Sequence, residues 1–164
     1  MIRCLMLLFC FSFFLKTATA QKLTVPELIS VLDLTTDKID TLMKHKNYKL
    51  LQKESDSGAI QIYYSNLERN PEGPDWVRSV TYTEIVVKNT KSKLISYRTY
   101  RKKEYQEILA WLLNNNFKTI KKDNFGMAVH TIYDNGNRSI LVKQVKQKLP
   151  NGVLVWSYEF ELGK

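Results

Sequence analysis

The stretch KNYKLLQKESDSGAIQIYYSN at residues 46–66 is followed, 69 positions later, by NNFKTIKKDNFGMAVHTIYDN at residues 115–135. Aligned without a gap, the two stretches are identical at six positions. The identical pairs are Asn47 and Asn116, Lys49 and Lys118, Lys53 and Lys122, Ala59 and Ala128, Tyr64 and Tyr133, and Asn66 and Asn135. The sequence therefore predicts that one structural unit occurs twice in the chain.

The similarity extends beyond these stretches on both sides. Upstream, the same offset aligns Ile39 with Ile108 and Met43 with Leu112. Downstream, the match resumes at an offset of 60, and the aligned segments are Arg78-Ser79-Val80 with Arg138-Ser139-Ile140, Lys88 with Lys148, and Leu94-Ile95 with Leu154-Val155. The difference between the offsets falls on LERNPEGPDW at residues 67–76, where the second copy has only the turn Asn135-Gly136. We expect residues 67–76 to form a loop that is inserted in the first copy.

Each copy is predicted to begin with a helix. In the first copy, Ile39, Leu42 and Met43 form an apolar stripe at helical spacing after Thr36-Asp37, and Asn47 is expected to end the helix in a left-handed conformation. In the second copy, a similar stripe runs from Arg101 to Asn115. A short additional helix, opened by Thr24, is expected before the first copy.

Four strands are predicted after each helix. Their expected ranges are 48–54, 59–66, 77–88 and 93–100 in the first copy, and 117–123, 127–134, 138–148 and 153–162 in the second. Short turns separate them, which is typical of antiparallel neighbours; the expected turns are Asp56-Ser57-Gly58, Asn89-Thr90-Lys91-Ser92, Asn124-Phe125-Gly126, Asn135-Gly136 and Pro150-Asn151-Gly152. In the last strand, alternation places Leu154, Trp156, Tyr158, Phe160 and Leu162 on one face.

The expected fold is α+β, with two tandem α-ββββ repeats whose antiparallel sheet carries helices on one face. Residues 21–100 are predicted to form the first repeat and residues 101–164 the second, within one compact domain.

Residues 1–20 have the pattern of a secretory signal peptide. A positive start at Arg3 precedes the apolar run from Cys4 to Leu15, and Ala18-Thr19-Ala20 matches the small-x-small cleavage pattern. The run is shorter than the roughly 20 residues that a membrane-spanning helix needs. We therefore expect cleavage near Ala20 and a periplasmic or secreted mature protein.

The mature chain is predicted to be basic and free of cysteine. Cys4 and Cys10 both lie in the predicted signal segment, so a disulfide framework is excluded, and a bacterial source is favoured. Without Arg3 and Lys16, 23 basic side chains face 16 acidic ones, a net charge of +7. Export argues against a nucleic-acid partner. The basic charge either serves solubility or attracts an anionic envelope surface; the densest basic runs are Lys44-His45-Lys46, Arg101-Lys102-Lys103 and Lys121-Lys122.

The order of a helix followed by a four-stranded meander, repeated once, resembles the β-lactamase inhibitor protein family. More loosely, it is similar to small envelope modules of the BamE or PepSY type. The resemblance covers most of the mature chain as a pattern of elements, and it implies a protein-binding role. Unlike the inhibitor family, this chain lacks disulfides.

The sequence offers no recognisable catalytic constellation. It has no G-x-S-x-G motif, glycine-rich phosphate loop or metal-spaced histidine cluster, and we expect no enzyme activity, no cofactor and no metal site. The two histidines, His45 and His130, are interpreted as structural or solvated. Glu159 and Glu161 share one face of a strand, and we expect them to balance the charge of nearby Lys and Arg side chains rather than act as acid and base.

Aromatic side chains and the inserted loop are the best candidates for recognition. Tyr and Trp are favoured at interfaces, although tyrosines in strands also pack against helices and brace neighbouring strands. Since Tyr63 and Tyr64 are adjacent in a strand, they must point to opposite faces. The candidate binding residues are Tyr63, Tyr97, Arg69, Asp75 and Trp76.

Two functions follow as expectations. The first is an exported, non-catalytic domain that binds an unknown protein through an open sheet face and the 67–76 loop, as an inhibitor, an immunity-type protein or an envelope assembly factor. The alternative is a basic envelope-associated module that contacts anionic lipid or a cell-surface polymer.

Overall fold

The computed structural model describes residues 21–66, 77–149 and 151–164. The predicted signal segment and the 67–76 loop lie outside the described residues. Three helices are present among them: α2 (Val25–Val31), α3 (Thr36–His45) and α4 (Lys102–Asn114). None of these helices is long and apolar enough to span a membrane.

Eight strands form one antiparallel sheet. They are β1 (Lys49–Asp56), β2 (Ala59–Ser65), β3 (Arg78–Val87), β4 (Thr90–Thr99), β5 (Lys118–Phe125), β6 (Ala128–Asp134), β7 (Ser139–Lys148) and β8 (Leu154–Gly163). Their spatial order is β1-β2-β3-β4-β8-β7-β6-β5, so β4 and β8 meet at the centre. The α+β class and the antiparallel sheet are confirmed.

Two predicted turns are wrong. The turn between β5 and β6 consists of Gly126 and Met127, because Asn124 and Phe125 belong to β5. The turn between β3 and β4 consists of Lys88 and Asn89, not of residues 89–92, and both residues have positive φ angles of 46° and 66°. A two-residue turn of this kind matches the right-handed twist of the strands that it joins. The segment from Thr90 to Ser92 is therefore free to pair with the end of β3.

Local interactions and backbone conformations define the helix ends. Thr24 caps α2 through a capping box, in which its hydroxyl accepts from the Glu27 N–H and the Glu27 carboxylate accepts from the Thr24 N–H. The chain leaves α3 at Asn47 with φ 60°, and it leaves α4 at Asn116 with φ 63°. The left-handed conformation expected at Asn47 is confirmed, because asparagine tolerates it better than most residues.

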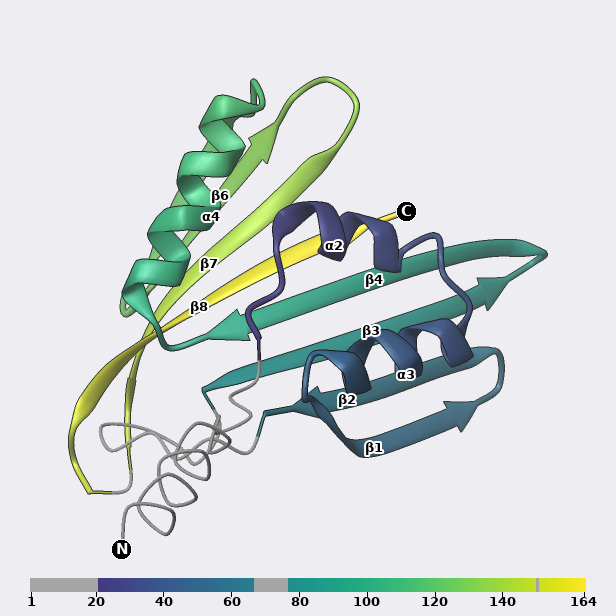
Figure 1. Ribbon diagram of the computed structural model, residues 1–164. Helices are drawn as coiled ribbons and strands as arrows, with labels where there is room; N and C mark the ends of the chain where they lie inside the picture. The colour runs from purple at the N-terminus through teal and green to yellow at the C-terminus, as the bar shows by residue number, and fades with distance from the viewer. Residues whose placement is uncertain (1–20, 67–76, 150) are drawn as a thin grey trace, which may run out of the picture.

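A single hydrophobic cluster holds the helices against the sheet. It includes residues of all three helices, such as Leu28, Ile39 and Leu112, together with alternate residues of β2, β3, β4, β7 and β8. In Figure 1, α2 and α3 lie in front of the strands of the first half, and α4 lies beside β6 and β7.

Several backbone hydrogen bonds occur in corresponding pairs. The Asn66 N–H donates to the Arg78 carbonyl at 3.1 Å, and the Asn135 N–H donates to the Arg138 carbonyl at 3.3 Å. Likewise, the Val86 N–H donates to the Gly58 carbonyl and the Lys146 N–H to the Met127 carbonyl, each at 2.8 Å. Both edge strands also contain a register irregularity, between Leu50 and Gln52 in β1 and between Thr119 and Lys121 in β5.

Gly58 allows the β1–β2 turn to approach β3. Its φ is +94°, and a Cβ added there would lie 3.0 Å from the Val86 carbonyl oxygen. Gly136 has a similar φ of +84° but open space around it. We expect Gly58→Ala to lower the free energy of unfolding by about 1–3 kcal/mol and by more than Gly136→Ala. Chemical denaturation of both variants tests this, and equal losses would show that only backbone conformation matters at Gly58.

Candidate binding surface on the sheet

The sheet has one face with buried apolar side chains and one with partly exposed polar ones. On β3, Val80 and Tyr82 are buried, whereas the alternate residues Ser79, Thr81 and Thr83 are partly exposed. This alternation follows from the two-residue period of a strand. The polar face, as we call it, continues across Ser96 and Arg98 of β4, Glu159 and Glu161 of β8, and Lys143 of β7.

Charges lie opposite one another across the centre of the polar face. Arg98 pairs in register with Glu159, and Glu159 pairs on its other side with Lys143. The Glu159 carboxylate accepts hydrogen bonds from Ser96 Oγ at 2.5 Å and from Arg98 Nη2 at 2.9 Å. Burial raises the pKa of Glu159, but the hydrogen bond from Ser96 and the charge of Arg98 outweigh this effect and lower the pKa overall. Glu159 is therefore held as a carboxylate.

A hollow of about 260 Å³ lies on the first half of this face. Its lining comes from five strands and consists of Leu51, Tyr63, Tyr64, Ser65, Ser79, Thr81, Ser96, Arg98 and Glu159. Hydroxyl groups therefore predominate, with one ion pair at the centre of the sheet. Such a lining offers both donors and acceptors to an incoming polar group.

The predicted binding residues lie in different environments. Tyr63 lies on the polar face and lines the hollow, while its neighbour Tyr64 is buried on the other face, as their adjacency requires. Tyr97 is 0% exposed, so it does not belong to a binding surface. Alternation along β4 directs Tyr97 into the core, where it pairs with Phe160 of β8. The other three candidates, Arg69, Asp75 and Trp76, lie outside the described residues.

The two glutamates considered for catalysis have ion-pair partners. Glu159 and Glu161 share the polar face, and they form ion pairs with Arg98 and Lys143, respectively. His45 is the last residue of α3. His130 lies in β6 beside the ring of Phe125, with the ring centroids 5.0 Å apart. Within the described ranges, no group of His, Cys, Asp and Glu side chains could hold a metal ion.

A buried ionic cluster was not predicted. Arg78 of β3 and Glu104 of α4 are 6% and 4% exposed, and Arg78 Nε lies 2.9 Å from a Glu104 oxygen. Glu104 also accepts hydrogen bonds from the hydroxyl groups of Tyr97 and Thr99. Burial lowers the pKa of Arg78, but the Glu104 charge outweighs this and raises it overall. The cluster attaches the first turn of α4 to the centre of the sheet.

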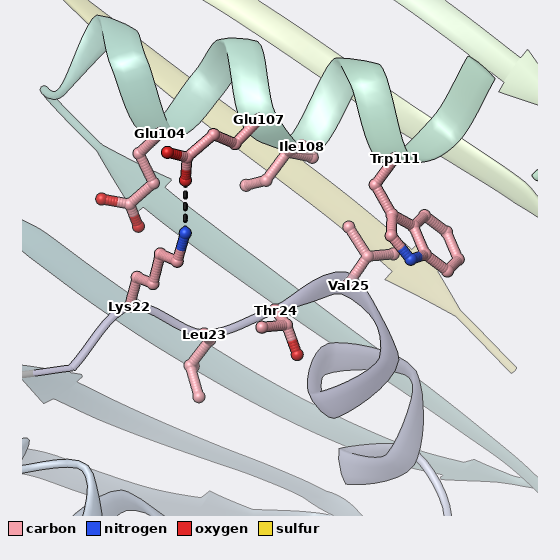
Figure 2. Close-up of a pocket in the computed structure, with 8 residues that line it drawn as sticks. All are labelled: Lys22, Leu23, Thr24, Val25, Glu104, Glu107, Ile108 and Trp111. Carbon is pink, nitrogen blue, oxygen red and sulfur yellow. Dashed lines mark hydrogen bonds and ion pairs between the residues drawn. The ribbon is translucent and has the colours of Figure 1, made fainter. Parts of the chain in front are cut away.

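A second cavity, of about 160 Å³, lies between α4 and the segment that leads into α2 (Figure 2). Leu23, Val25 and Ile108 give it apolar walls, and an ion pair between Lys22 and Glu107 crosses its edge. Glu104 is the buried carboxylate on its wall, and its oxygens are already bound by Arg78, Tyr97 and Thr99. This cavity is therefore largely apolar space beside the buried ionic cluster.

Comparisons of the chain with protein-family models, with curated proteins and with solved structures find no match.

Proposed function

We propose that the protein is an exported, non-catalytic domain that binds another protein through the polar face of its sheet. The observation that carries the proposal is the hollow of about 260 Å³ lined by Tyr63, by hydroxyl groups and by the Arg98–Glu159 pair. Tyrosine and arginine contribute more binding energy at protein interfaces than most residues do. The proposed surface does not include residues 67–76, because they lie outside the described residues.

The polar face is also ordered before binding. Glu159 fixes Ser96 and Arg98 by hydrogen bonds, and the strands beneath them are fully paired on both sides. A surface built on paired strands loses little conformational entropy when a partner binds. An inhibitor, immunity-type or envelope assembly role agrees with such a rigid surface.

The proposal includes a duplicated α-ββββ unit with its helices on one face of the sheet. Corresponding backbone hydrogen bonds support the duplication. The bond from Val86 to Gly58 has its counterpart in the bond from Lys146 to Met127, since Met127 lies 69 positions after Gly58 and Lys146 lies 60 positions after Val86. The strand register requires one change in the alignment. Tyr82 pairs with Ile95, and the corresponding Val142 pairs with Phe160. Phe160 rather than Val155 is therefore the counterpart of Ile95, because the β7–β8 connection is longer than the two-residue turn at Lys88.

Thr81→Trp is the variant that tests the binding face. Thr81 lies between Tyr63 and Ser96 in register, so an indole at this position should fill the hollow. The chain from Gln21 to Lys164 should retain a discrete protein from a bacterial envelope extract, and Thr81→Trp should abolish this retention. Thr119→Trp, on the exposed edge strand β5, is the matched control and should bind normally.

Ionic strength separates this proposal from general basic attraction. A protein interface centred on Tyr63 should persist at high salt, whereas attraction between exposed charges is screened. Retention that disappears at high salt, or that Thr81→Trp leaves unchanged, would contradict binding through the polar face.

A further inference from the structure

Gln21 directly follows the small-x-small segment Ala18-Thr19-Ala20 and is the first described residue. Cleavage after Ala20 would leave Gln21 with a free α-amine. The side-chain amide of a terminal glutamine can react with its own α-amine, because the ring that closes has five members. The folded part of the chain begins almost at once, since Leu23 is 1% exposed.

The structure fixes the backbone of this terminal segment. The Gln21 N–H donates to the Lys46 carbonyl at 3.1 Å, and Lys46 caps the C-terminus of α3. Leu23 belongs to the hydrophobic cluster, and Lys22 pairs with Glu107 of α4 beside it (Figure 2). Gln21 itself is exposed. Its nitrogen is therefore held in place, while the residue is open to solvent.

A cyclic terminus fits this position. In the lactam that Gln21 can form, the nitrogen carries one hydrogen, which is all that the bond to the Lys46 carbonyl needs. A free α-amine would instead be largely protonated at neutral pH. It would add a cation beside Lys22 and Lys46, which are paired with Glu107 and Glu27. Cyclisation removes this extra charge and keeps the hydrogen bond. The fold loses only the weak attraction between an ammonium group and the C-terminus of α3.

We propose that Gln21 is the N-terminal residue of the exported protein and that it is modified to pyroglutamate. The lone pair of its α-nitrogen attacks the side-chain carbon Cδ, and a C–N bond forms between them. The bond from Cδ to Nε2 breaks, and Nε2 leaves as ammonia with a proton from the α-amine. No oxidant or other reactant is needed. The proposal rests on the export proposed above, with cleavage after Ala20, and it is independent of binding through the polar face.

The modification would protect the terminal segment from exopeptidases. Aminopeptidases bind a free α-amine, which a pyroglutamate terminus lacks. Gln21 and Lys22 are the exposed residues before the buried Leu23, so they are the first that such an enzyme could remove. Loss of Gln21 would also remove the N–H that binds the Lys46 carbonyl. The cyclic terminus therefore preserves the contact of this segment with α3.

Mass spectrometry of the exported protein tests the proposal. The complete chain, with residues 1–20, is expressed in a bacterium and purified from the periplasmic or culture fraction. After digestion with a protease that cleaves after glutamate, the terminal peptide should run from Gln21 to Glu27. It should weigh about 17 Da less than the linear peptide, because one ammonia has been lost. The intact mass, measured before digestion, should show the same loss, which excludes cyclisation of the peptide during handling.

Gln21→Ser is the matched control, because serine has no side-chain amide that could close the ring. Its terminal peptide should have the linear mass, and an aminopeptidase should shorten this variant but not the parent protein. A linear peptide that begins at Gln21 would overturn the modification and leave the predicted cleavage intact. A peptide that begins elsewhere, or that retains residues 1–20, would overturn both.

Nuclear magnetic resonance tests the geometry. In the nitrogen-15 spectrum, the lactam N–H of residue 21 should give a cross-peak, whereas the terminal amine of Gln21→Ser exchanges too fast to do so. Since this N–H binds the Lys46 carbonyl, it should exchange with water at least about tenfold more slowly than in the isolated peptide from Gln21 to Glu27. Equal exchange in protein and peptide would overturn the placement of the cyclic terminus against Lys46.

Discussion

Glu104→Ala should lower the free energy of unfolding by about 3–5 kcal/mol, because it leaves the Arg78 guanidinium buried without its carboxylate partner. The loss is a large part of the 5–15 kcal/mol typical of a domain. Two further donors, the hydroxyl groups of Tyr97 and Thr99, also lose their acceptor. Urea denaturation followed by circular dichroism measures the change.

Glu107→Ala is the matched control for Glu104→Ala. Glu107 is on the same helix, one turn later, and its ion pair with Lys22 is exposed. Exposed ion pairs contribute little to stability, since water screens both charges. Glu107→Ala should therefore leave the unfolding curve nearly unchanged. Similar shifts for both variants would show that the buried cluster is no more important than a surface pair.

A double variant separates the charge from the packing. Arg78→Met combined with Glu104→Met removes both charges while retaining much of the side-chain volume. Because no unpaired charge remains, this variant should be more stable than Glu104→Ala. If it were equally unstable, the loss would arise from packing or from the remaining hydroxyl groups of Tyr97 and Thr99.

The strands were predictable because turn residues mark their ends. Ser57-Gly58 and Gly126 have positive φ angles, and the strands begin or end next to them. The exceptions were the turns predicted to begin at Asn89 and Asn124, where the turn residues indicated the place of the turn but not its length. Such a two-residue turn depends on how the strands pair, which local composition does not specify.

Which side chains are buried was harder to predict. Alternation put Trp156 and Leu154 on the same face as Phe160, and the register agrees, yet both side chains are exposed. Alternation defines the face of a strand but not how far the helices extend along it. Tyr63 and Tyr97 lie on opposite faces of the sheet, and the sequence did not show which face the helices cover.

Contacts between distant residues left no signal in the sequence. Arg78 and Glu104 are 26 positions apart and lie on a strand and a helix. Their contact depends on the angle at which α4 crosses the sheet. The ion pair between Arg98 and Glu159 forms because β4 lies next to β8 in the sheet. The order of strands in space is not encoded in local sequence, so this pair could not be predicted.

Phe160→Ala should destabilise the protein by about 3–5 kcal/mol, the usual loss when a buried phenylalanine leaves a cavity. Phe160 is 1% exposed, and it pairs with Tyr97 of β4 on one side and Val142 of β7 on the other. Its ring lies 6.0 Å from that of Tyr105 on α4. The substitution therefore removes packing where the two halves of the sheet meet. Thermal and chemical unfolding measure the loss.

Phe125→Ala is the control for Phe160→Ala, because Phe125 is 59% exposed and the chemical change is the same. It should change stability by less than about 0.5 kcal/mol, as surface substitutions usually do. Both variants should also unfold in one transition, since β4 and β8 share one hydrophobic cluster. Two separate transitions in Phe160→Ala would contradict this, because they would mean that strands β1–β4 and strands β5–β8 each hold their fold without the central β4–β8 pairing.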